Sequence, residues 1–434
     1  MKRENHGRIV KRIWAALLCA MLFFGGVPTA AQPILAAQEG AAQTLITNNQ
    51  KDEAFSFSLE NGKLIINSVP STGGYQYVRV RIGENWEIFP ITGQAEFDLP
   101  RADGVYYVEI FLGKERYGTY QGVLSGEDLG IVIKNGVASF VESPVYAHNQ
   151  ELYEAGSTSD TALGYYTQPS HWVESDAAEI KALAEKIVSS GDSDYEKVRK
   201  VHDWVAGNIW YDYDSLYSGA SAEVDALKVL KLKRSVCHGY ANLTAALLRS
   251  MGIPTKVTCG YALGVSTNGA WTDANKANHA WNEAYVDGRW VILDTTWDSG
   301  NKYQGGRFSE GTGLRSRKYF DPTLEFFSAD HKIFPEDEYD QWERGQAFSS
   351  ALSISQKSLT LKKGGTKKLK VKTSKKYINI EDAKITYTSS NKKVASVNSK
   401  GKITAKKVGT AVITTKVKLE GVTLEFRTSV TVKG

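Results

Sequence analysis

Cysteine is scarce in this sequence, with three residues among 434, at positions 19, 237 and 259. So few cysteines exclude a scaffold held together by disulfides and a zinc site built from clustered cysteine pairs. The seven histidines are scattered and form no His-Glu-x-x-His motif, and no glycine-rich phosphate loop follows a hydrophobic run. We therefore expect neither a metal nor another cofactor.

Long hydrophobic runs are equally scarce, apart from residues 13–24. A basic segment precedes this run and small residues follow it, which is the order of a secretory signal peptide. We predict a signal peptide over residues 1–37, cleaved between Ala30 and Ala37. The run is shorter than the roughly 20 residues of a membrane span, so we expect a secreted protein with no span after cleavage. An uncleaved anchor is the alternative.

Removal of the signal peptide leaves Cys237 and Cys259 in the mature chain. In an exported protein these two could form one disulfide, which would take Cys237 out of any chemistry. The residues around Cys237 are better explained by a free nucleophile, and Cys259 lies in an apolar run typical of a buried strand. The disulfide remains the main alternative to a reactive thiol.

The length of the chain suggests two to four domains, and we predict a multidomain α+β protein. Residues 38–125 offer about seven short alternating runs separated by turn residues, which predict an N-terminal antiparallel β-sandwich. Residues 126–164 are predicted to be a connector with a hairpin turning at Asn135-Gly136. Helical and strand patterns alternate in a catalytic domain at 165–345, and a second β-sandwich is expected at 351–434.

The catalytic domain contains a helix that begins with a cysteine. From position 237 to 250 apolar residues recur at helical spacing, and Gly252 followed by Pro254 is a stop signal. Cys237 therefore lies in the first turn, where free backbone N–H groups and the positive end of the helix dipole favour a thiolate. A thiol nucleophile at neutral pH needs such an environment.

A hairpin further along the chain carries a histidine and an aspartate. Asp287-Gly288 is a strong signal for a two-residue type I′ turn between runs rich in Val, Ile, Trp and Tyr. If Val286 pairs with Arg289, His279 and Asp294 fall on the same face as diagonal neighbours, about 7–8 Å apart at the backbone. A one-residue bulge would move one of them to the other face.

These residues fill the roles of nucleophile (Cys237), base (His279) and orienting carboxylate (Asp294). Their surroundings, Cys-His-Gly-Tyr-Ala, Met-Gly-Ile-Pro, Asn-His-Ala-Trp-Asn-Glu and Leu-Asp-Thr-Thr-Trp, resemble the bacterial transglutaminase-like family over roughly residues 165–335. The resemblance implies a papain-like core and the same three residues as a catalytic triad. It leaves the reaction open, because the family includes transamidating enzymes, proteases and non-catalytic relatives.

Four further residues are candidates for the oxyanion site or the pocket. The Tyr211 hydroxyl is one candidate to stabilise an oxyanion, although the backbone N–H of Cys237 is the better one by its place at a helix start. His238 diverges from Cys237 on the helix by about 100 degrees and could line the pocket rim, but not act as the base. Trp281 and Trp297 are expected to shield the site from water.

For two polar residues, His202 and Glu283, the sequence favours a structural role. His202 sits beside the apolar stripe of a predicted helix, so we expect a packed, hydrogen-bonded histidine rather than a ligand. Glu283 shares a strand face with Trp281, and pairing with a basic residue is favoured over contact with substrate. The resemblance also places an aromatic strand and the pair Asp330-His331 at the end of the catalytic domain.

The C-terminal part has a different charge from the rest. Residues 351–434 hold 20 Lys and Arg against four acidic residues, a net charge of +16, whereas the preceding 350 residues hold 33 against 44, a net charge of −11. Ser-Ser-Asn, Val-Ala-Ser-Val and Gly-Lys-Ile-Thr-Ala follow one another as in the bacterial immunoglobulin-like domains of group 2, which this part resembles. Tyr387 stands where that family more often has tryptophan. The resemblance implies a seven-strand sandwich.

The basic sandwich has too few aromatic residues to stack on bases, so we expect no nucleic-acid partner. Salt-sensitive attraction to an anionic cell-envelope polymer and a simple spacer role are equally good hypotheses. For the whole chain we predict an exported cysteine enzyme that acts on protein or peptide amide bonds through a thioester intermediate, as a protease or a transamidase, at the cell envelope. The alternative is a surface-associated binding or structural protein that keeps the fold without catalysis.

Overall fold

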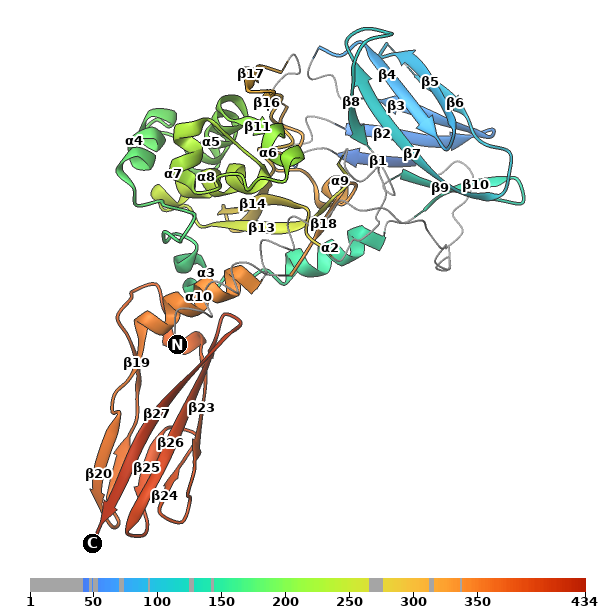
Figure 1. Cartoon of the computed structure of the whole chain (residues 1–434). Coiled ribbons are helices and arrows are strands. Elements are labelled where there is room, and N and C mark those ends of the chain that lie inside the picture. Colours follow the sequence, from blue (N-terminus) through green and yellow to red (C-terminus); the bar gives the residue numbers. More distant parts are fainter. Residues whose placement is uncertain are drawn as a thin grey trace. The chain divides into compact units, whose positions relative to one another are not determined.

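The computed structural model describes residues 42–46, 49, 54–69, 74–92, 94–124, 129–141, 144–264, 276–311, 316–335 and 338–434. The predicted signal peptide lies outside these residues. The chain forms two compact units: the first takes the described residues up to 156 and from 172 to 335, and the second takes 157–171 and the part after 335 (Figure 1). In the described part of the chain, no helix is long and apolar enough to cross a membrane.

Two antiparallel sheets form the N-terminal sandwich of the first unit. One has the order β1-β2-β3-β6 and the other β10-β9-β7-β4-β5, with β8 on β7. Their strands are β1 (Ala42–Ile46), β2 (Ala54–Glu60), β3 (Lys63–Ser68), β4 (Tyr77–Ile82), β5 (Asn85–Pro90), β6 (Ala95–Asp98), β7 (Gly104–Gly113), β8 (Tyr120–Leu124), β9 (Gly130–Lys134) and β10 (Val137–Val141).

The seven alternating runs read from the sequence correspond to β2–β8. The sandwich does not end at the predicted boundary of residue 125, because β9 pairs with β7 and β10 pairs with β9. Ile131 and Ile133 of β9 are buried in the sandwich core, which explains why the sheet continues to Val141 through the predicted connector.

Helices and two small sheets make up the remainder of the first unit. One sheet has the order β15-β14-β13-β18 and the other β12-β11-β16-β17. The strands are β11 (Trp210–Asp212), β12 (Arg234–Ser235), β13 (Thr255–Ala262), β14 (His279–Val286), β15 (Arg289–Leu293), β16 (Lys302–Gln304), β17 (Arg307–Ser309) and β18 (His331–Ile333). The helices are α2 (Pro144–Glu154), α4 (Ala178–Ile187), α5 (Asp194–Asn208), α6 (Tyr213–Ser218), α7 (Ala226–Leu232), α8 (Cys237–Ser250) and α9 (Leu324–Phe327). The predicted aromatic closing strand is thus a short helix, α9, followed by β18.

Helix α8 is the central helix of this part and packs on β13 and β14 (Figure 1). Its apolar side chains, among them Tyr240, Leu243 and Leu247, are fully buried, as the helical spacing predicted. Gly252, with φ of 81°, ends it in the left-handed conformation that glycine adopts without strain. The buried Asn282 of β14 donates to the carbonyl oxygens of Ala241 on α8 and Lys256 on β13, both at 2.9 Å, and so ties the helix to the sheet.

The sandwich and the part of the first unit that contains α9 share one hydrophobic core. Phe55 of β2 stacks on Phe326 of α9 with ring centroids 6.5 Å apart, and Phe326 and Phe327 are fully buried. Asn49 also donates to Asp321 at 2.9 Å. The N-terminal sandwich therefore packs against α9, in the same part of the first unit that carries the candidate site.

The second unit contains two helices, α3 (Asp160–Tyr165) and α10 (Glu338–Ala351), and a β-sandwich. Sheet orders are β19-β22, β20-β27-β26-β23 and β21-β25-β24. The elements are β19 (Leu352–Ile354), β20 (Ser358–Lys362), β21 (Thr366–Lys368), β22 (Val371–Thr373), η3 (Ile380–Asp382), β23 (Lys384–Ser389), β24 (Ala395–Val397), β25 (Lys402–Ala405), β26 (Gly409–Leu419) and β27 (Val422–Lys433). In residues 351–434, all described, nine strands replace the expected seven.

The multidomain α+β class predicted from the sequence is confirmed. The predicted limits of the catalytic domain, 165–345, differ from the observed units, since residues 165–171 and 338–345 lie with the C-terminal sandwich. Tyr165 packs edge-on against Phe348 of α10, and Arg344 donates to the hydroxyl of Tyr166, so both helices are held by aromatic and polar contacts that sequence spacing does not reveal.

Candidate active site

Cys237 is the first residue of α8, as predicted, and is 8% exposed. The first N–H groups of a helix have no intrahelical acceptor, so its backbone N–H is left for another partner. Gly239 lets this helix start approach β12 closely: a Cβ at that position would lie 2.0 Å from Ser235 Oγ. The glycine in the Cys-His-Gly-Tyr-Ala motif thus sets where the thiol stands.

His279 begins β14 and joins the thiol to a carboxylate. Its Nε2 donates to Asp294 Oδ2 at 2.5 Å, and Cys237 lies near enough to the ring to help raise the pKa of His279. Because Nε2 is occupied by Asp294, the contact with the sulfur falls to Nδ1. Each nitrogen of the imidazole therefore has a different partner, which is the arrangement of a general base with its orienting carboxylate.

The hairpin turn and its register are confirmed. Asp287 and Gly288 have φ of 52° and 81°, as a type I′ turn requires, and Val286 pairs with Arg289. The strand pairing ends at Asn282 and Leu293, however, so the part of the ladder expected to include Asp294 is absent from this hairpin.

Asp294 starts a turn instead. Its N–H donates to the carbonyl oxygen of Tyr319 at 2.9 Å, and its Oδ1 accepts the backbone N–H groups of Thr296 at 2.9 Å and Trp297 at 3.0 Å. The carboxylate could not cap this turn if the ladder continued. Proximity of His279 and Asp294 was correctly predicted, although the side chain reaches the ring from a turn and not from a strand.

Charge is concentrated at these two residues. Burial by itself lowers the pKa of His279, but the charge and hydrogen bond of Asp294 raise it to about 10. Burial by itself raises the pKa of Asp294, but the charge of His279 and hydrogen bonds from His279 and His331 hold it well below its usual value. At neutral pH the pair is therefore an imidazolium beside a carboxylate.

Tyr211, on β11, packs against the small cluster formed by Cys237, Ala241 and Ala280. Burial, and then the charge of Cys237, raise the pKa of its hydroxyl well above the usual value. The hydroxyl therefore stays protonated and can donate. His238, the next residue on α8, has a different neighbour, since its ring meets that of Trp172 edge-on with centroids 5.2 Å apart.

The two tryptophans cover the histidine, as expected. Trp281 is 1% exposed and its ring centroid lies 6.0 Å from that of His279, while the ring of the partly buried Trp297 lies 5.7 Å away. Gly260 leaves room for the first ring, since a Cβ there would lie 2.4 Å from Trp281 Cη2. Together the rings separate the His279–Asp294 pair from water.

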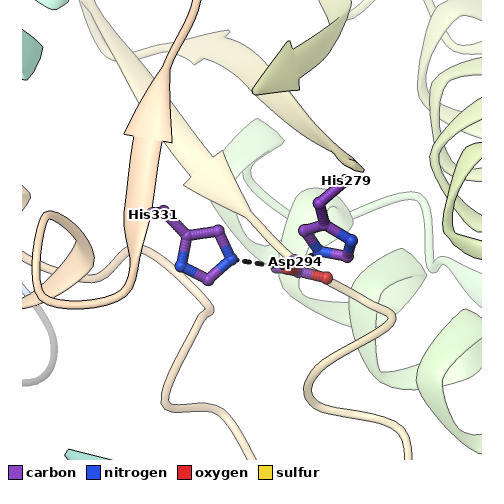
Figure 2. Close-up of side chains that lie close together, drawn as sticks. All are labelled: His279, Asp294 and His331. Atoms are coloured by element: carbon purple, nitrogen blue, oxygen red, sulfur yellow. Dashed lines mark hydrogen bonds and ion pairs between the residues drawn. The ribbon is translucent and has the colours of Figure 1, made fainter. Parts of the chain in front are cut away.

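A further histidine reaches the site without having been predicted to do so. His331, the first residue of β18, donates from Nε2 to Asp294 Oδ2 at 3.2 Å and is fully buried (Figure 2). The sequence placed Asp330-His331 at the end of the domain but gave the pair no role in the site. The sequence feature that could have indicated this role is the Asp-His pair before a short apolar strand. The direction of the His331 side chain is determined by the pairing of His331 with Ala262 of β13.

His202 and Glu283 have the structural roles that were expected. His202 is fully buried and contacts Asp203 at 3.3 Å and Asp298 at 3.0 Å through its two ring nitrogens. Glu283 accepts from Lys256 at 3.0 Å. No disulfide joins Cys237 and Cys259, so the disulfide alternative is not realised in this structure.

His279, Asp294 and His331 could each offer one ligand to a metal, their ligand atoms lying within 4.8 Å of one another. A tetrahedral zinc ion with bonds of about 2.0 Å holds its ligand atoms roughly 3.3 Å apart. The 2.5 Å between His279 Nε2 and Asp294 Oδ2 is a hydrogen-bond distance instead. These three side chains would have to separate to admit an ion, so their arrangement fits a hydrogen-bonded network.

Comparison with known proteins identifies two domains. The transglutaminase-like superfamily model matches residues 181–295, which include Cys237, His279 and Asp294, and the bacterial Ig-like domain (group 2) model matches residues 350–425. The chain therefore carries a transglutaminase-like domain and a bacterial Ig-like domain, as the sequence motifs predicted. A fold of the first kind supports an enzyme of the transglutaminase or cysteine protease type.

Individual relatives match only part of the chain. Kyphoscoliosis peptidase of Mus musculus is 28% identical over 157 residues, 36% of this chain and 23% of that protein. The uncharacterized protein YebA of Bacillus subtilis is 28% identical over 127 residues, 27% of this chain and 17% of that protein. The crystal structure of red sea bream transglutaminase covers 86% of this chain and 80% of its own, with 10% identity and a TM-score of 0.27. The chain thus spans less than a quarter of the length of these two curated relatives.

Proposed function

We propose that this protein is an exported cysteine enzyme that acts on protein or peptide amide bonds through Cys237, His279 and Asp294. The observation that carries the proposal is the position of His279, whose ring contacts both the Cys237 thiol and the Asp294 carboxylate. Similarity to a peptidase and to transglutaminases agrees with this chemistry.

The reaction begins with attack of the Cys237 thiolate on the amide carbonyl carbon. The backbone N–H of Cys237 and the protonated hydroxyl of Tyr211 are the candidates to stabilise the oxyanion that forms. The carbon–nitrogen bond then breaks, the His279 imidazolium gives its proton to the departing nitrogen, and the acyl group remains as a thioester. Water or an amine loses a proton to His279, attacks the thioester and restores the thiol.

An activity assay on casein, with and without a fluorescent primary amine, tests the proposal. Cleavage indicates a protease, and incorporation of the amine indicates a transamidase. Either activity should disappear in Cys237→Ala and persist in Cys259→Ala, the matched control at the other cysteine of the described chain. Activity that survives Cys237→Ala contradicts the proposal.

The alternative is a binding or structural protein that keeps the fold. Alkylation by iodoacetamide separates the two independently of substrate, because only a thiolate reacts rapidly. In the enzyme, Cys237 should react at pH 6, where an ordinary thiol with a pKa near 8.5 is almost fully protonated. A reaction that needs alkaline pH and is unaffected by His279→Ala would favour the binding protein.

We further propose that the Ig-like domain holds the enzyme at an anionic polymer of the cell envelope. Lys368 pairs with Lys402 across β21 and β25, and Lys384 pairs with Lys418 across β23 and β26; all four are exposed. Like charges directly opposite each other destabilise a sheet. A bound polyanion would relieve this repulsion. A domain that served only as a spacer would gain nothing from lysines paired in this way.

Elution from a polyphosphate resin tests this second proposal. Replacing the four paired lysines by glutamine should lower the salt concentration at which the full chain elutes, since fewer counterions are displaced. Lys181→Gln with Lys186→Gln, two exposed lysines of α4, is the matched control and should elute as the wild type does. Equal elution of both variants would count against the proposal.

A further inference from the structure

The carboxylate of Asp294 lies between two imidazole rings (Figure 2). Oδ2 accepts from His279 Nε2 at 2.5 Å and from His331 Nε2 at 3.2 Å. Oδ1 accepts the N–H groups of Thr296 and Trp297. Four donors surround the carboxylate, about as many as its lone pairs can accept.

We propose that His331 is a positioning residue: bonded to Asp294 as a second imidazole, it fixes the carboxylate that turns His279 toward Cys237. The proposal rests on the proposed function, because it assigns a role within the same site. His331 does not contact the sulfur or the reacting atoms, and it acts only through Asp294.

His331 cannot replace His279 as the base. Its Nδ1 is 2.5 Å from Asp330 Oδ1 and its Nε2 is on Asp294, so both ring nitrogens are occupied. The ring is 0% exposed. By contrast, His279 has one nitrogen on Asp294 and one toward the thiol.

The contacts of His331 form a closed ring of hydrogen bonds. Asp330 Oδ2 accepts from the Tyr319 hydroxyl at 2.5 Å, and the carbonyl oxygen of Tyr319 accepts from the backbone N–H of Asp294 at 2.9 Å. Burial, and then the neighbouring Asp330, raise the pKa of Tyr319 well above its usual value, so its hydroxyl keeps the hydrogen that it donates. Asp294 is thus held through its main chain and its side chain by the same set of residues.

Aromatic rings enclose this network. Phe327 stacks on His331 with centroids 4.2 Å apart and an interplanar angle of 15°, and the rings of Trp281 and Trp297 lie 5.4 Å and 4.4 Å from it. The titratable groups that face His331 are Asp294, Asp330, His279 and Tyr319. With water excluded, a donor lost from Asp294 is not replaced by solvent, and Oδ2 is then held less firmly against His279.

Two amide substitutions separate positioning from mere structural support. The amide nitrogen of glutamine can occupy the place of Nε2, whereas the shorter asparagine can reach only the place of Nδ1. His331→Gln therefore keeps the donor to Asp294, and His331→Asn keeps only the contact with Asp330. A purely structural role predicts no difference between the two variants once both are folded.

The test measures the rate of iodoacetamide alkylation of Cys237 in the full chain from pH 5 to 9. It also measures kcat and KM on casein. In His331→Gln, we expect iodoacetamide to alkylate Cys237 at pH 6 at a rate within about threefold of the wild-type rate. His331→Asn should lose about 10- to 100-fold in rate and in kcat, with KM unchanged, a size typical of lost partners behind a ligand or catalytic group. Urea unfolding verifies that both variants are folded.

Equal alkylation rates in the two folded variants, or a slower rate in His331→Gln, overturn the proposal. If neither folds, Tyr319→Phe decides, because it removes one hydroxyl and keeps the ring: the rate at pH 6 should fall about threefold, and an unchanged rate overturns the proposal. Failure of the proposed function is visible separately, as a wild-type thiol that does not react at pH 6 and does not respond to His279→Ala.

Discussion

Two buried histidines of the first unit are hydrogen-bonded to carboxylates, and they differ in the partners of their ring nitrogens. His202 is 0% exposed and His279 is 7% exposed. Burial lowers the pKa of His202, but its hydrogen bonds to Asp203 and Asp298 raise it to about 9, close to the value of about 10 reached by His279. Yet both nitrogens of His202 face carboxylates, while one nitrogen of His279 faces a thiol. A raised pKa alone therefore does not identify a catalytic base.

The two clusters are also joined in the structure. Asp298 accepts the backbone N–H of Tyr319 at 3.0 Å as well as the imidazole of His202. Arg317 donates to both oxygens of Asp203, at 2.9 and 2.7 Å. The His202 cluster thus holds the segment that brings Tyr319 to Asp294. In the proposed mechanism the His279 cluster carries out the chemistry, and the His202 cluster keeps Tyr319 and Asp294 in place.

The largest expected difference between the clusters is chemical. His279→Ala should lower kcat by at least about 1,000-fold and abolish alkylation of Cys237 at pH 6, because the thiolate loses its imidazolium partner. His202→Ala should leave the alkylation rate of the folded protein within about threefold. Stopped-flow alkylation of both variants below the onset of unfolding measures this. Comparable losses in both would remove the distinction between the two histidines.

Stability should show the reverse order. His202→Ala leaves the fully buried Asp298 without its imidazole, and breaking a buried ion pair in this way costs about 3–5 kcal/mol of unfolding free energy. His171→Ala, at an exposed histidine, is the control and should cost less than about 0.5 kcal/mol. Urea titration gives both values, and a cost for His202→Ala near that of the control would show that its ion pairs contribute little.

Stability should fall at alkaline pH through the same histidines. Both pKa values in the folded state lie above that of an unfolded histidine, about 6.5. Their contribution is therefore fully present below about pH 6.5 and is lost as the pH rises through about 9 for His202 and about 10 for His279. For His202 the loss is on the order of 3 kcal/mol or less. Urea midpoints from pH 6 to 10 should decline in the wild type, and less steeply in His202→Asn; identical slopes would contradict the assignment.

A smaller effect is expected at Gly260, which leaves room for the Trp281 ring beside His279. At Gly260 a Cβ would lie 2.2 Å from the carbonyl oxygen of Lys332 and 2.4 Å from Trp281, so Gly260→Ala should cost about 1–3 kcal/mol by overpacking and slow alkylation of Cys237. Gly191→Ala is the matched control, because nothing lies within 4 Å of its Cβ and its φ is ordinary. Thermal unfolding with alkylation at pH 6 compares the two, and equal behaviour would show that the sheet absorbs the methyl group.

Much of the fold could be predicted because its signals are local. Asn135-Gly136 and Asp287-Gly288 take positive φ values in the structure, as their turn chemistry predicted, and Cys237 begins the helix that Gly252 ends. What could not be predicted depends on packing between distant segments. Nothing around Gly130 indicates that β9 will pair with β7, and nothing around Asp160 indicates that α3 will lie with the C-terminal sandwich.

The sequence by itself indicated the three residues of the candidate site and the closeness of His279 and Asp294, because the Asp287-Gly288 turn sets the register of the hairpin that brings the two segments together. Only the tertiary structure decided that Asp294 leaves the ladder, that Nδ1 of His279 is the nitrogen left for the thiol, and that His331 arrives from 37 residues beyond Asp294 to share its carboxylate. These features arise when β18 pairs with β13 and Tyr319 reaches Asp294. Such contacts form only between segments already folded, and no local pattern encodes them.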